Sequence, residues 1–503
     1  MKRLDCVIAS LPFIEYYLPP AAPAVLKGHL EHKGFTVQTI DLNINVKETF
    51  EHNNLVLASA FFHANRGDTN FPPALLKQID IMIDGWVDKL LAFNPRYIGL
   101  SVFSFDSRVA CEIVVKKLKE KKHDCKVFIG GAGLRGRGDT NDEEWLESII
   151  PYIDHYIMGE GELACENLLK GNFKYPGINS QAEQIKDLSA LGPADFKDYD
   201  LRSYEQFYAE RQVVMITGSR GCVRNCTFCN INNHWPSFTW RTSDSIIKEM
   251  QMVYETHGIR DFFFTDSLIN GNLKVYMEMV EGLANFNYKT DAKITWGGQY
   301  IVRKNKNLSK DYFTLTRDSG AFNLVMGVES GSNNVLAHMK KGVTREDLDQ
   351  FIENFDKHDI TTSYQIIIGY PTETDKDFEE TLDMFYDHQK YVGSGTIHGA
   401  SLLPMSVTGG TPLEMDPNPV YERTSDLDDT WGWISTAVPS LDWPKRLERR
   451  IIAQEVLDQL HWPTVSADRN LGNLFKKHES YIKWTKGTTS TSILKQPDPS
   501  FLS

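Results

Sequence analysis

Three cysteines stand close together near the middle of the chain, in the stretch GCVRNCTFC. Cys222, Cys226 and Cys229 have the spacing CxxxCxxC, and no cysteine follows them before the end of the chain. Thiolates at such a spacing are typical metal ligands, but a closed structural zinc site needs four ligands. An iron–sulfur cluster held by three thiolates instead leaves one iron open to a small molecule. The spacing therefore favours a cluster that binds a ligand.

A structural zinc site is the alternative interpretation of the same cysteines. His234 would be the fourth ligand, but a zinc knuckle has a cysteine five positions after its histidine, where this chain has Thr239. No second CxxC pair completes a four-thiolate site, because the other cysteines are scattered and resemble small core residues: Cys6, Cys111, Cys125 and Cys165. On this interpretation the chain is a non-catalytic, zinc-stabilised binding scaffold.

The composition is that of a globular protein without a strongly basic surface. The chain has 503 residues, enough for two or three domains, and its 54 Lys and Arg against 67 Asp and Glu give a net charge of −13. This charge argues against bulk nucleic-acid binding. No apolar run approaches the length of a membrane span, and residues 1–20 are too interrupted for a signal peptide. Seven cysteines, an odd number, then indicate a reducing compartment, the cytoplasm.

The first 173 residues alternate short β-rich runs with helical patterns. Strands are expected at 5–10, 35–42, 97–105, 126–131 and 153–159. Helical periodicity occupies 22–34 and 107–122, whereas 41–46 has the character of a helix-free loop. Strands that alternate with such helices predict an α/β fold, here a Rossmann-like parallel sheet covered on both faces. Ligands of such sheets bind beyond the carboxyl ends of the strands.

A second α/β alternation follows a linker, residues 174–206, which is rich in Pro, Gly and Asp. Six strands are expected at 212–219, 261–267, 293–300, 322–330, 363–370 and 395–404. The helix at 243–258 has Ser243 as its candidate cap and Gly258 as its stop. Six strand–helix units over 207–410 predict a partial (β/α)6 barrel with its chemistry at the carboxyl ends of the strands. The region 411–503 is expected to be small and mostly helical, with one helix at 445–460 and a tail after it.

The cysteine motif resembles that of the radical S-adenosylmethionine (SAM) superfamily. The family motif is CxxxCxxC with an aromatic residue before the last cysteine, matched here by Phe228. The resemblance implies a 4Fe–4S cluster on the three cysteines, whose free iron chelates the amino and carboxylate groups of SAM. An electron from the cluster would then cleave SAM to a 5′-deoxyadenosyl radical. This chemistry needs a protected cavity and an electron donor such as flavodoxin or ferredoxin.

Further stretches match the family at the strand ends where it binds SAM: FFFTDS (262–267), GVESGSNNVLAHMKKGVT (327–344) and IIIGYPTETDKDFEETL (366–382). The resemblance implies Thr265, Asp266 and Ser267 at the methionine amine, Arg303 at its carboxylate, Glu329 and Ser330 at the ribose and sulfonium, and the strand containing Ile368 at adenine. Two of these residues have structural alternatives. Asp266 is also a candidate helix cap, and Glu329 a candidate member of a buried ion pair.

The pattern GxGxxG at 131–136 makes dinucleotide binding one alternative for the first domain. However, it follows the fourth strand rather than the first and does not open directly into a helix. Residues 1–173 instead resemble the cobalamin-binding domain that precedes the radical SAM core in one large subfamily, and LGPADFKDY (191–199) resembles its bridge. The resemblance implies that the nucleotide tail of cobalamin enters near Ser101, Gly130 and Gly131. The D-x-H-x-x-G motif that donates a histidine to cobalt is absent. Either the cobalt has no histidine ligand, as occurs in this subfamily, or the domain keeps the cobalamin-type fold without the cofactor.

These resemblances together predict a cytoplasmic enzyme similar to class B radical SAM methyltransferases. The expected reaction is methyl transfer to an unactivated carbon of a small-molecule metabolite, with cobalamin as the methyl carrier. The alternative is a cyclase or rearrangement enzyme of the same architecture, which consumes SAM without transferring a methyl group.

Overall fold

The computed structural model describes most of the chain: residues 3–13, 16, 18–63, 71–121, 123–134, 141–204, 212–290, 292–424 and 431–463. The chain divides into two compact units, Met1–Gly218 with Thr239–Phe263, and Ser219–Phe238 with Phe264–Ser503. The domain boundaries expected from the sequence stay predictions. None of the described helices combines the length and the apolar composition that a membrane crossing requires.

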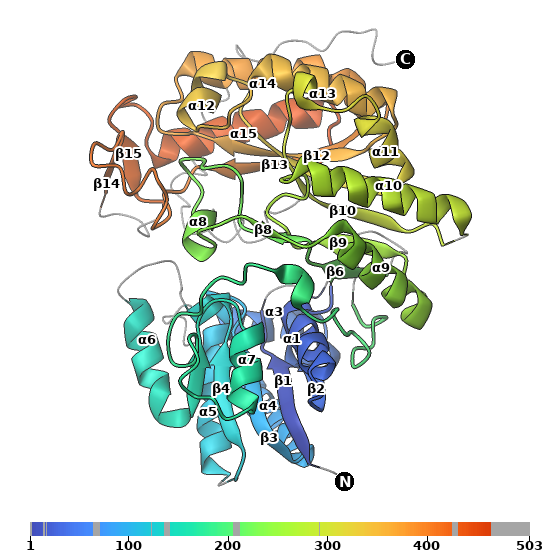
Figure 1. Ribbon diagram of the computed structural model, residues 1–503. Coiled ribbons are helices and arrows are strands. Elements are labelled where there is room, and N and C mark those ends of the chain that lie inside the picture. Colours follow the sequence, from blue (N-terminus) through green and yellow to red (C-terminus); the bar gives the residue numbers. More distant parts are fainter. Residues whose placement is uncertain are drawn as a thin grey trace. The chain divides into compact units, whose positions relative to one another are not determined.

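The first sheet has five parallel strands in the order β2-β1-β3-β4-β5 (Figure 1). The strands are β1 (Leu4–Ser10), β2 (Val37–Asp41), β3 (Pro95–Ser101), β4 (Lys126–Gly130) and β5 (His155–Ile157). The helices around them are α1 (Ala21–His32), α2 (Leu42–Thr49), α3 (His52–His63), α4 (Pro73–Ala92), α5 (Arg108–Glu120), α6 (Asn141–Ile149) and α7 (Glu162–Leu169). The five predicted strands and the Rossmann-like class are confirmed.

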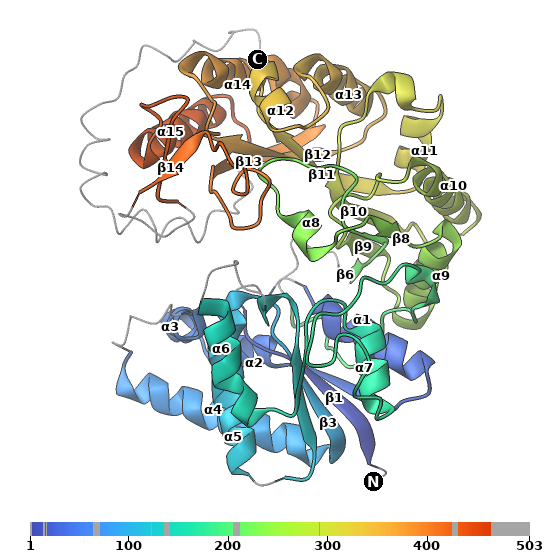
Figure 2. The ribbon, with the colours of Figure 1, turned by 60° about the vertical axis from the view of Figure 1, so that its left-hand side comes forward.

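Both faces of this sheet are buried under helices, as is usual for parallel strands. Successive residues of β1 point to opposite faces. Val7 packs in one core with α4 and α5, and Ile8 packs in a second core with α1 and α7. These two pairs of helices lie on opposite sides of the sheet (Figure 2). The four scattered cysteines are buried in these two cores: Cys111 and Cys125 in the first, Cys6 and Cys165 in the second. They are therefore core residues of the first unit.

The expectation of a helix-free loop at 41–46 is wrong, because α2 begins directly after β2. Asp41 ends the strand and caps the helix, since its carboxylate accepts a hydrogen bond of 2.9 Å from the backbone N–H of Asn43. The apolar residues that follow, Leu42, Ile44 and Val46, alternate as they would in a strand, and this spacing concealed the helix in the sequence.

Asp41 is also a buried carboxyl group, and its titration gives a test of this part of the fold. Burial raises the pKa of Asp41 to about 6, although Tyr204 donates a hydrogen bond of 2.8 Å to its Oδ2. A raised pKa means that the folded state holds the proton more tightly than the unfolded state. The contribution of Asp41 to stability is therefore greatest below about pH 4 and is lost as the pH rises towards 6.

We expect Asp41→Asn to raise the free energy of unfolding by about 2–3 kcal/mol at pH 7. Asparagine caps a helix about as well as aspartate and does not ionise. The measurement is the unfolding midpoint of wild type and variant between pH 4 and pH 7. Wild type should lose stability relative to the variant across this range. Parallel pH profiles for the two proteins would contradict the assignment.

The segment expected as a linker packs onto the first sheet and its helices. Its described part, residues 174–204, forms isolated bridges to the end of β5 and to Met158, and it buries Ile178, Leu188 and Phe196. Gly28 of α1 allows its close approach, since a Cβ at Gly28 would lie 1.7 Å from the carbonyl oxygen of Pro193. The bridge-like stretch is thus held by the first unit.

The second sheet has six strands in the order β13-β12-β11-β10-β9-β6. They are β6 (Val213–Ile216), β9 (Asp261–Phe264), β10 (Thr295–Tyr300), β11 (Ala321–Glu329), β12 (Thr362–Ile368) and β13 (Ile397–Pro404). The helices between them are α9 (Ser243–His257), α10 (Leu273–Lys289), α11 (Tyr312–Asp318), α12 (Asn333–His338), α13 (Arg345–Lys357) and α14 (Asp375–Gly393). Since β10 to β13 pair in parallel, the predicted partial barrel is confirmed. Short elements flank the cysteines: β7 (Ser219–Arg220), α8 (Ile231–His234) and β8 (Thr239–Trp240).

The N-cap of helix α9 lies one residue earlier in the chain than expected, because Ser243 is already the first residue of the helix. Thr242, not Ser243, is the N-cap, and its hydroxyl accepts a hydrogen bond from the N–H of Ser245 at 3.3 Å. A cap needs an extended backbone, which Thr242 has, whereas Ser243 is already helical. Gly258 ends the helix in the left-handed conformation at φ 70°, as predicted.

The C-terminal region adds a small hairpin and one long helix. The strands β14 (Tyr421–Arg423) and β15 (Trp433–Ser435) pair antiparallel, and α15 (Trp443–Gln459) packs beside β13 and α14. The helix matches the one expected at 445–460. The hairpin was not predicted, because its strands are too short for a period-two pattern to be visible. The expected tail lies outside the described residues.

Candidate active site

The cysteine loop is held in place by contacts to Thr227, which lies between Cys226 and Phe228. The backbone N–H of Thr227 donates to the carbonyl of Met339 at 3.1 Å, and its carbonyl accepts from the N–H of Leu413 at 2.8 Å. Its hydroxyl lies 2.8 Å from the hydroxyl of Tyr370, which in turn lies 3.0 Å from Nδ1 of His338. Segments from three parts of the second unit therefore fix the loop.

The three thiols occupy a site of mixed polarity. Cys226 is buried, and Cys222 and Cys229 are half-buried. Burial raises the pKa of each thiol, and the positive charge of Lys341 acts in the opposite direction on all three. The N–H of Arg224 also donates to Sγ of Cys222 at 3.3 Å. Cationic and N–H donors next to the sulfurs suit thiolates that bind a metal.

The geometry does not support a single zinc ion on these cysteines. Within the described ranges, no three or more His, Cys, Asp or Glu side chains converge as ligands of one ion. His234, the expected fourth ligand, ends α8 with its ring beside Trp235. A zinc site needs its four ligands around one point. A 4Fe–4S cluster binds each thiolate at a different iron, so the donor set fits a cluster better than zinc.

Glu329 ends β11 and pairs with Lys341. Its Oε1 lies 3.0 Å from Nζ of Lys341, and both side chains are largely buried. Glu329 has φ 68°, a left-handed conformation that is costly for a residue other than glycine. Nζ of Lys341 also lies 5.9 Å from the ring centroid of Phe228. The pair therefore joins the end of β11 to the cysteine loop, and Glu329 is the ion-pair member that the sequence left as an alternative.

The sequence did not assign a role to Lys341, which is followed by Gly342 in the segment after α12. Burial alone would lower the pKa of Lys341, but the Glu329 carboxylate and the Cys226 thiol keep it above its ordinary value. Lys341 thus carries a positive charge beside the cysteines. The only sequence signal was a lysine before a glycine, and that signal does not reveal which groups it meets.

Thr265, Asp266 and Ser267, which are expected at the methionine amine of SAM, follow the end of β9. Asp266 is buried and accepts a hydrogen bond of 2.5 Å from the hydroxyl of Ser219. Thr265 is exposed and Ser267 is half-buried. Asp266 does not cap a helix, because α10 begins later with Asn272 as its cap. This excludes the structural alternative proposed for Asp266.

Arg303 follows β10 with its guanidinium directed at backbone carbonyls. Its Nη2 donates to the carbonyls of Asn270 at 2.5 Å and Gly271 at 2.7 Å. Its Nε is buried and has no hydrogen-bond partner among the described residues. A buried donor without an acceptor is costly. An added carboxylate would satisfy it, which fits the expected place of the SAM carboxylate.

Ser330 and Ile368 lie at the ends of neighbouring strands, β11 and β12. Both side chains are fully buried. The hydroxyl of Ser330 lies 3.1 Å from that of Thr381 in α14, so it is engaged within the protein. Ile368 is followed by Gly369 at φ 78°, where the chain turns away from the sheet. The residues expected to bind SAM thus follow the carboxyl ends of β9, β10, β11 and β12, together with the cysteine loop.

In the first unit, the residues expected at cobalamin lie in one row at the carboxyl edge of the sheet. Ser10 aligns with Ser101, and Ser101 with Gly130. Gly131 has φ 119°, and a Cβ there would lie 2.4 Å from the carbonyl oxygen of Val102, so the fold itself requires this glycine. The GxGxxG pattern, which offered dinucleotide binding as an alternative, ends at Gly136, outside the described residues. Its described part enters a 3-10 turn at Ala132–Leu134 rather than an α-helix, as noted for the sequence.

The protein therefore combines two parallel sheets covered by helices with a loop of three cysteines that lacks a fourth protein ligand among the described residues. Residues 216–385 match the profile of the Radical SAM superfamily. This part of the chain is therefore a radical SAM domain, as expected from the cysteine motif.

Curated proteins are similar in sequence to part of this chain. The anaerobic magnesium-protoporphyrin IX monomethyl ester cyclase of Cereibacter sphaeroides is 25% identical over 48% of the chain and 42% of its own length. The bacteriochlorophyllide d C-12(1)-methyltransferase of Chlorobaculum tepidum is 26% identical over 46% of the chain and 50% of its own length. The chain thus spans about half the length of these curated relatives.

A solved structure shares the fold of both units. The radical SAM methyltransferase TsrM of Kitasatospora setae, solved with cobalamin and a [4Fe-4S] cluster, matches 85% of this chain and 78% of its own chain with a TM-score of 0.59. Its sequence identity is 15%, so the likeness concerns the fold. The expected architecture, a Rossmann-like sheet followed by a radical SAM barrel, is confirmed.

Proposed function

We propose that this protein is a radical SAM enzyme that cleaves SAM at a 4Fe–4S cluster and transfers a methyl group with the help of cobalamin. The observation that carries the proposal is the set of Cys222, Cys226 and Cys229 beside the buried ion pair of Lys341 and Glu329. All five residues lie within the segment that matches the radical SAM profile. Three thiolates leave one coordination position for a ligand. The reduced cluster, when bound, supplies the electron that breaks the S–C5′ bond of SAM.

The chain's own residues would bind and orient SAM. Asp266 offers a buried carboxylate for the methionine amine, and Arg303 has an unsatisfied Nε for the methionine carboxylate. Glu329 and Ser330 would lie along the ribose, and the backbone after Ile368 along the adenine. Thr265, Ser267 and Phe228 would complete the site. Fixing SAM in one orientation lowers the barrier to its cleavage.

The first unit would hold cobalamin at its carboxyl edge, near Ser101, Gly130 and Gly131. Cobalamin, when bound, carries the methyl group. The fold likeness to TsrM, whose structure contains cobalamin, supports this assignment. A Cβ at Gly130 would lie 3.4 Å from the carbonyl oxygen of Ile157, an ordinary van der Waals contact, so the protein itself does not require glycine at this position. No D-x-H-x-x-G motif is present to donate a histidine to cobalt.

A cyclase or rearrangement enzyme of the same architecture is the second candidate. The relative in Cereibacter sphaeroides supports it, because its name describes ring formation rather than methyl transfer. We propose a small-molecule substrate and an electron donor such as flavodoxin or ferredoxin for either reaction. All seven cysteines are free thiols, which supports a reducing compartment such as the cytoplasm.

The test is cobalt content together with the products of SAM. After loading with hydroxocobalamin and anaerobic cluster reconstitution, we expect about one cobalt and about four iron per chain. Turnover with reductant and a small-molecule extract should give both 5′-deoxyadenosine and S-adenosylhomocysteine. 5′-Deoxyadenosine without S-adenosylhomocysteine would favour the cyclase. Absence of cobalt after loading would defeat cobalamin-dependent methyl transfer.

Two glycine-to-alanine variants test whether cobalamin binds beside Gly130. Gly130→Ala adds one methyl group where the protein has room for it, but where we place the cofactor. We expect it to fold normally and to retain several-fold less cobalt. Gly85→Ala in α4 is the control, because a Cβ there meets no atom within 4 Å. Equal cobalt content in both variants would move the cofactor away from Gly130.

A further inference from the structure

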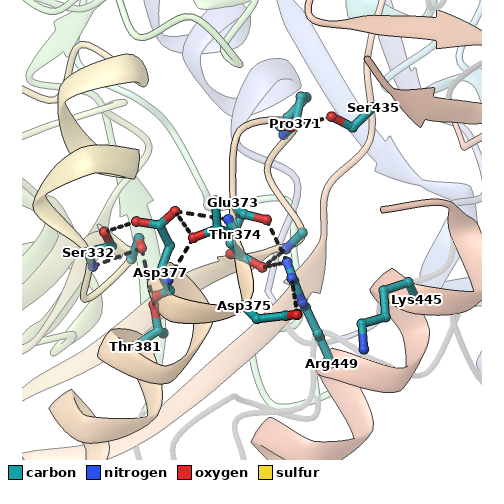
Figure 3. A network of polar contacts seen from close by, with 12 residues as sticks. Ser332, Pro371, Glu373, Thr374, Asp375, Asp377, Thr381, Ser435, Lys445 and Arg449 are labelled. Carbon is teal, nitrogen blue, oxygen red and sulfur yellow. Dashed lines mark hydrogen bonds and ion pairs between the residues drawn. The ribbon is translucent and has the colours of Figure 1, made fainter. Parts of the chain in front are cut away.

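The loop between β12 and α14, residues Gly369–Thr374, contains a buried carboxylate that bonds back to the start of the loop. Glu373 is fully buried, and its Oε1 accepts a hydrogen bond of 3.0 Å from the N–H of Gly369. This contact returns the loop to the end of β12. Glu373 therefore ties the loop to the end of β12, and it lies at the centre of a network of polar contacts (Figure 3).

Arg449 of α15 donates three hydrogen bonds to the end of this loop and the first residue of α14. Its Nη1 donates to Oε1 and to the backbone carbonyl of Glu373, both at 2.8 Å, and its Nη2 donates to Oδ1 of Asp375 at 2.8 Å (Figure 3). A planar guanidinium can make these bonds together, whereas an ammonium group cannot. The helix thus fixes both the side chain and the backbone of Glu373.

The same helix and the neighbouring hairpin close off the start of the loop. A Cβ on Gly369 would lie 2.4 Å from Cγ of Arg446, so the α15 side chain fills the space beside the end of β12. Ser435 of β15 donates to the carbonyl of Pro371 at 2.6 Å. The C-terminal region therefore contacts the loop along most of its length.

The network continues from this loop to the one that follows β11. Asp377, at the start of α14, accepts a hydrogen bond of 2.6 Å from the hydroxyl of Ser332. Thr381 accepts from the N–H of Gly331 at 3.1 Å and contacts the hydroxyl of Ser330 at the same distance. The two loops that we place around the ribose and the adenine of SAM are thereby joined to each other and to α15.

A purely stabilising role explains this arrangement poorly. Oε2 of Glu373 and Nε of Arg449 are buried without hydrogen-bond partners among the described residues. Buried ion pairs with unmet hydrogen bonds contribute little net stability compared with apolar residues of similar size. What the pair does provide is a defined geometry for the loop.

We propose that Arg449 is a positioning residue for SAM: by fixing Glu373, it sets the backbone at the end of β12 where adenine binds. The inference rests on the proposed function, since it presumes that SAM binds at these strand ends. It gives the C-terminal region a role in the active site, although none of its residues needs to touch the cofactor.

The test compares Arg449→Met with the double variant Arg449→Met/Glu373→Gln. The single variant leaves a buried carboxylate without its partner, so we expect it to be unstable and to bind SAM weakly. The double variant removes both charges and keeps an amide oxygen for the N–H of Gly369. We expect its unfolding midpoint and its iron content to return to those of wild type, while its affinity for SAM stays about tenfold lower.

SAM affinity is read from the change that SAM causes in the electron paramagnetic resonance signal of the reduced cluster, titrated with SAM. Lys445→Met, on the same helix, is the control and should titrate like wild type, because the Lys445 side chain pairs with Glu448 of its own helix and, among the described residues, donates no hydrogen bond to the loop. Arg449→Lys keeps the charge beside Glu373 and should also fold, with SAM affinity reduced about threefold, since an ammonium cannot reproduce the fork.

Wild-type SAM affinity in the double variant would overturn the inference, as would wild-type affinity in Arg449→Lys. Either result would make Arg449 a structural residue only. A wild-type protein with a complete cluster whose signal does not respond to SAM would instead overturn the proposed function itself. The two failures are therefore distinguishable.

Discussion

Replacing Cys222, Cys226 and Cys229 together by alanine is expected to abolish SAM cleavage. The three thiolates are the only cysteines in the second unit, and the remaining four are buried in the two cores of the first sheet. No other set of three metal-binding side chains exists among the described residues to replace them. Without ligands the iron is lost, and with it the electron that cleaves SAM. The expected loss is complete, not a reduced rate.

The measurement is iron content and 5′-deoxyadenosine formation after anaerobic reconstitution. Wild type should hold about four iron per chain, and the triple variant almost none. Cys125→Ser is the matched control, because Cys125 is a core residue of the first unit, and it should keep wild-type iron and turnover. A triple variant that still forms 5′-deoxyadenosine would refute the cluster assignment. A wild-type protein that is colourless, contains zinc and does not turn over SAM would instead support the binding scaffold.

The sequence was sufficient to predict the parts of the fold with strong local signals. All eleven predicted strands are present, because parallel strands buried on both faces are continuous β-rich runs between turn residues. The α9 terminus at Gly258 followed from the left-handed conformation that glycine adopts easily. The cysteine motif was visible because its meaning lies in spacing alone. Local patterns of this kind do not depend on the rest of the chain.

Features that depend on long-range contacts were not predictable. Helix α2 escaped because its apolar residues alternate, and burial in the tertiary structure decided in favour of a helix. The contact between Glu373 and Arg449 joins residues 76 positions apart. Nothing in either segment marks it. Glu329 was assigned to SAM from its motif, but its left-handed backbone and its lysine partner became visible only in the folded chain.

Lys341→Met is expected to have the largest effect of any substitution outside the cysteines. Its charge lies beside all three thiols, 3.0 Å from Oε1 of Glu329. Removing it leaves a buried carboxylate unpaired and takes away a positive charge that favours the reduced, more negative cluster. We expect the reduction potential of the cluster to fall by about 60 mV, a tenfold change for one electron, and SAM cleavage to slow at least as much. The measurement is a redox titration followed by electron paramagnetic resonance.

A double variant separates the charge of Lys341 from the role of Glu329. Lys341→Met/Glu329→Gln removes one positive and one negative charge, so the local net charge is restored and the potential should return towards wild type. SAM cleavage should stay slow, because the carboxylate that we place at the ribose is gone. Lys340→Asn is the control, since Lys340 is exposed and its left-handed backbone is one that asparagine tolerates. If the potential of Lys341→Met equals that of wild type, Lys341 does not act on the cluster and its position beside the cysteines serves only to pair Glu329.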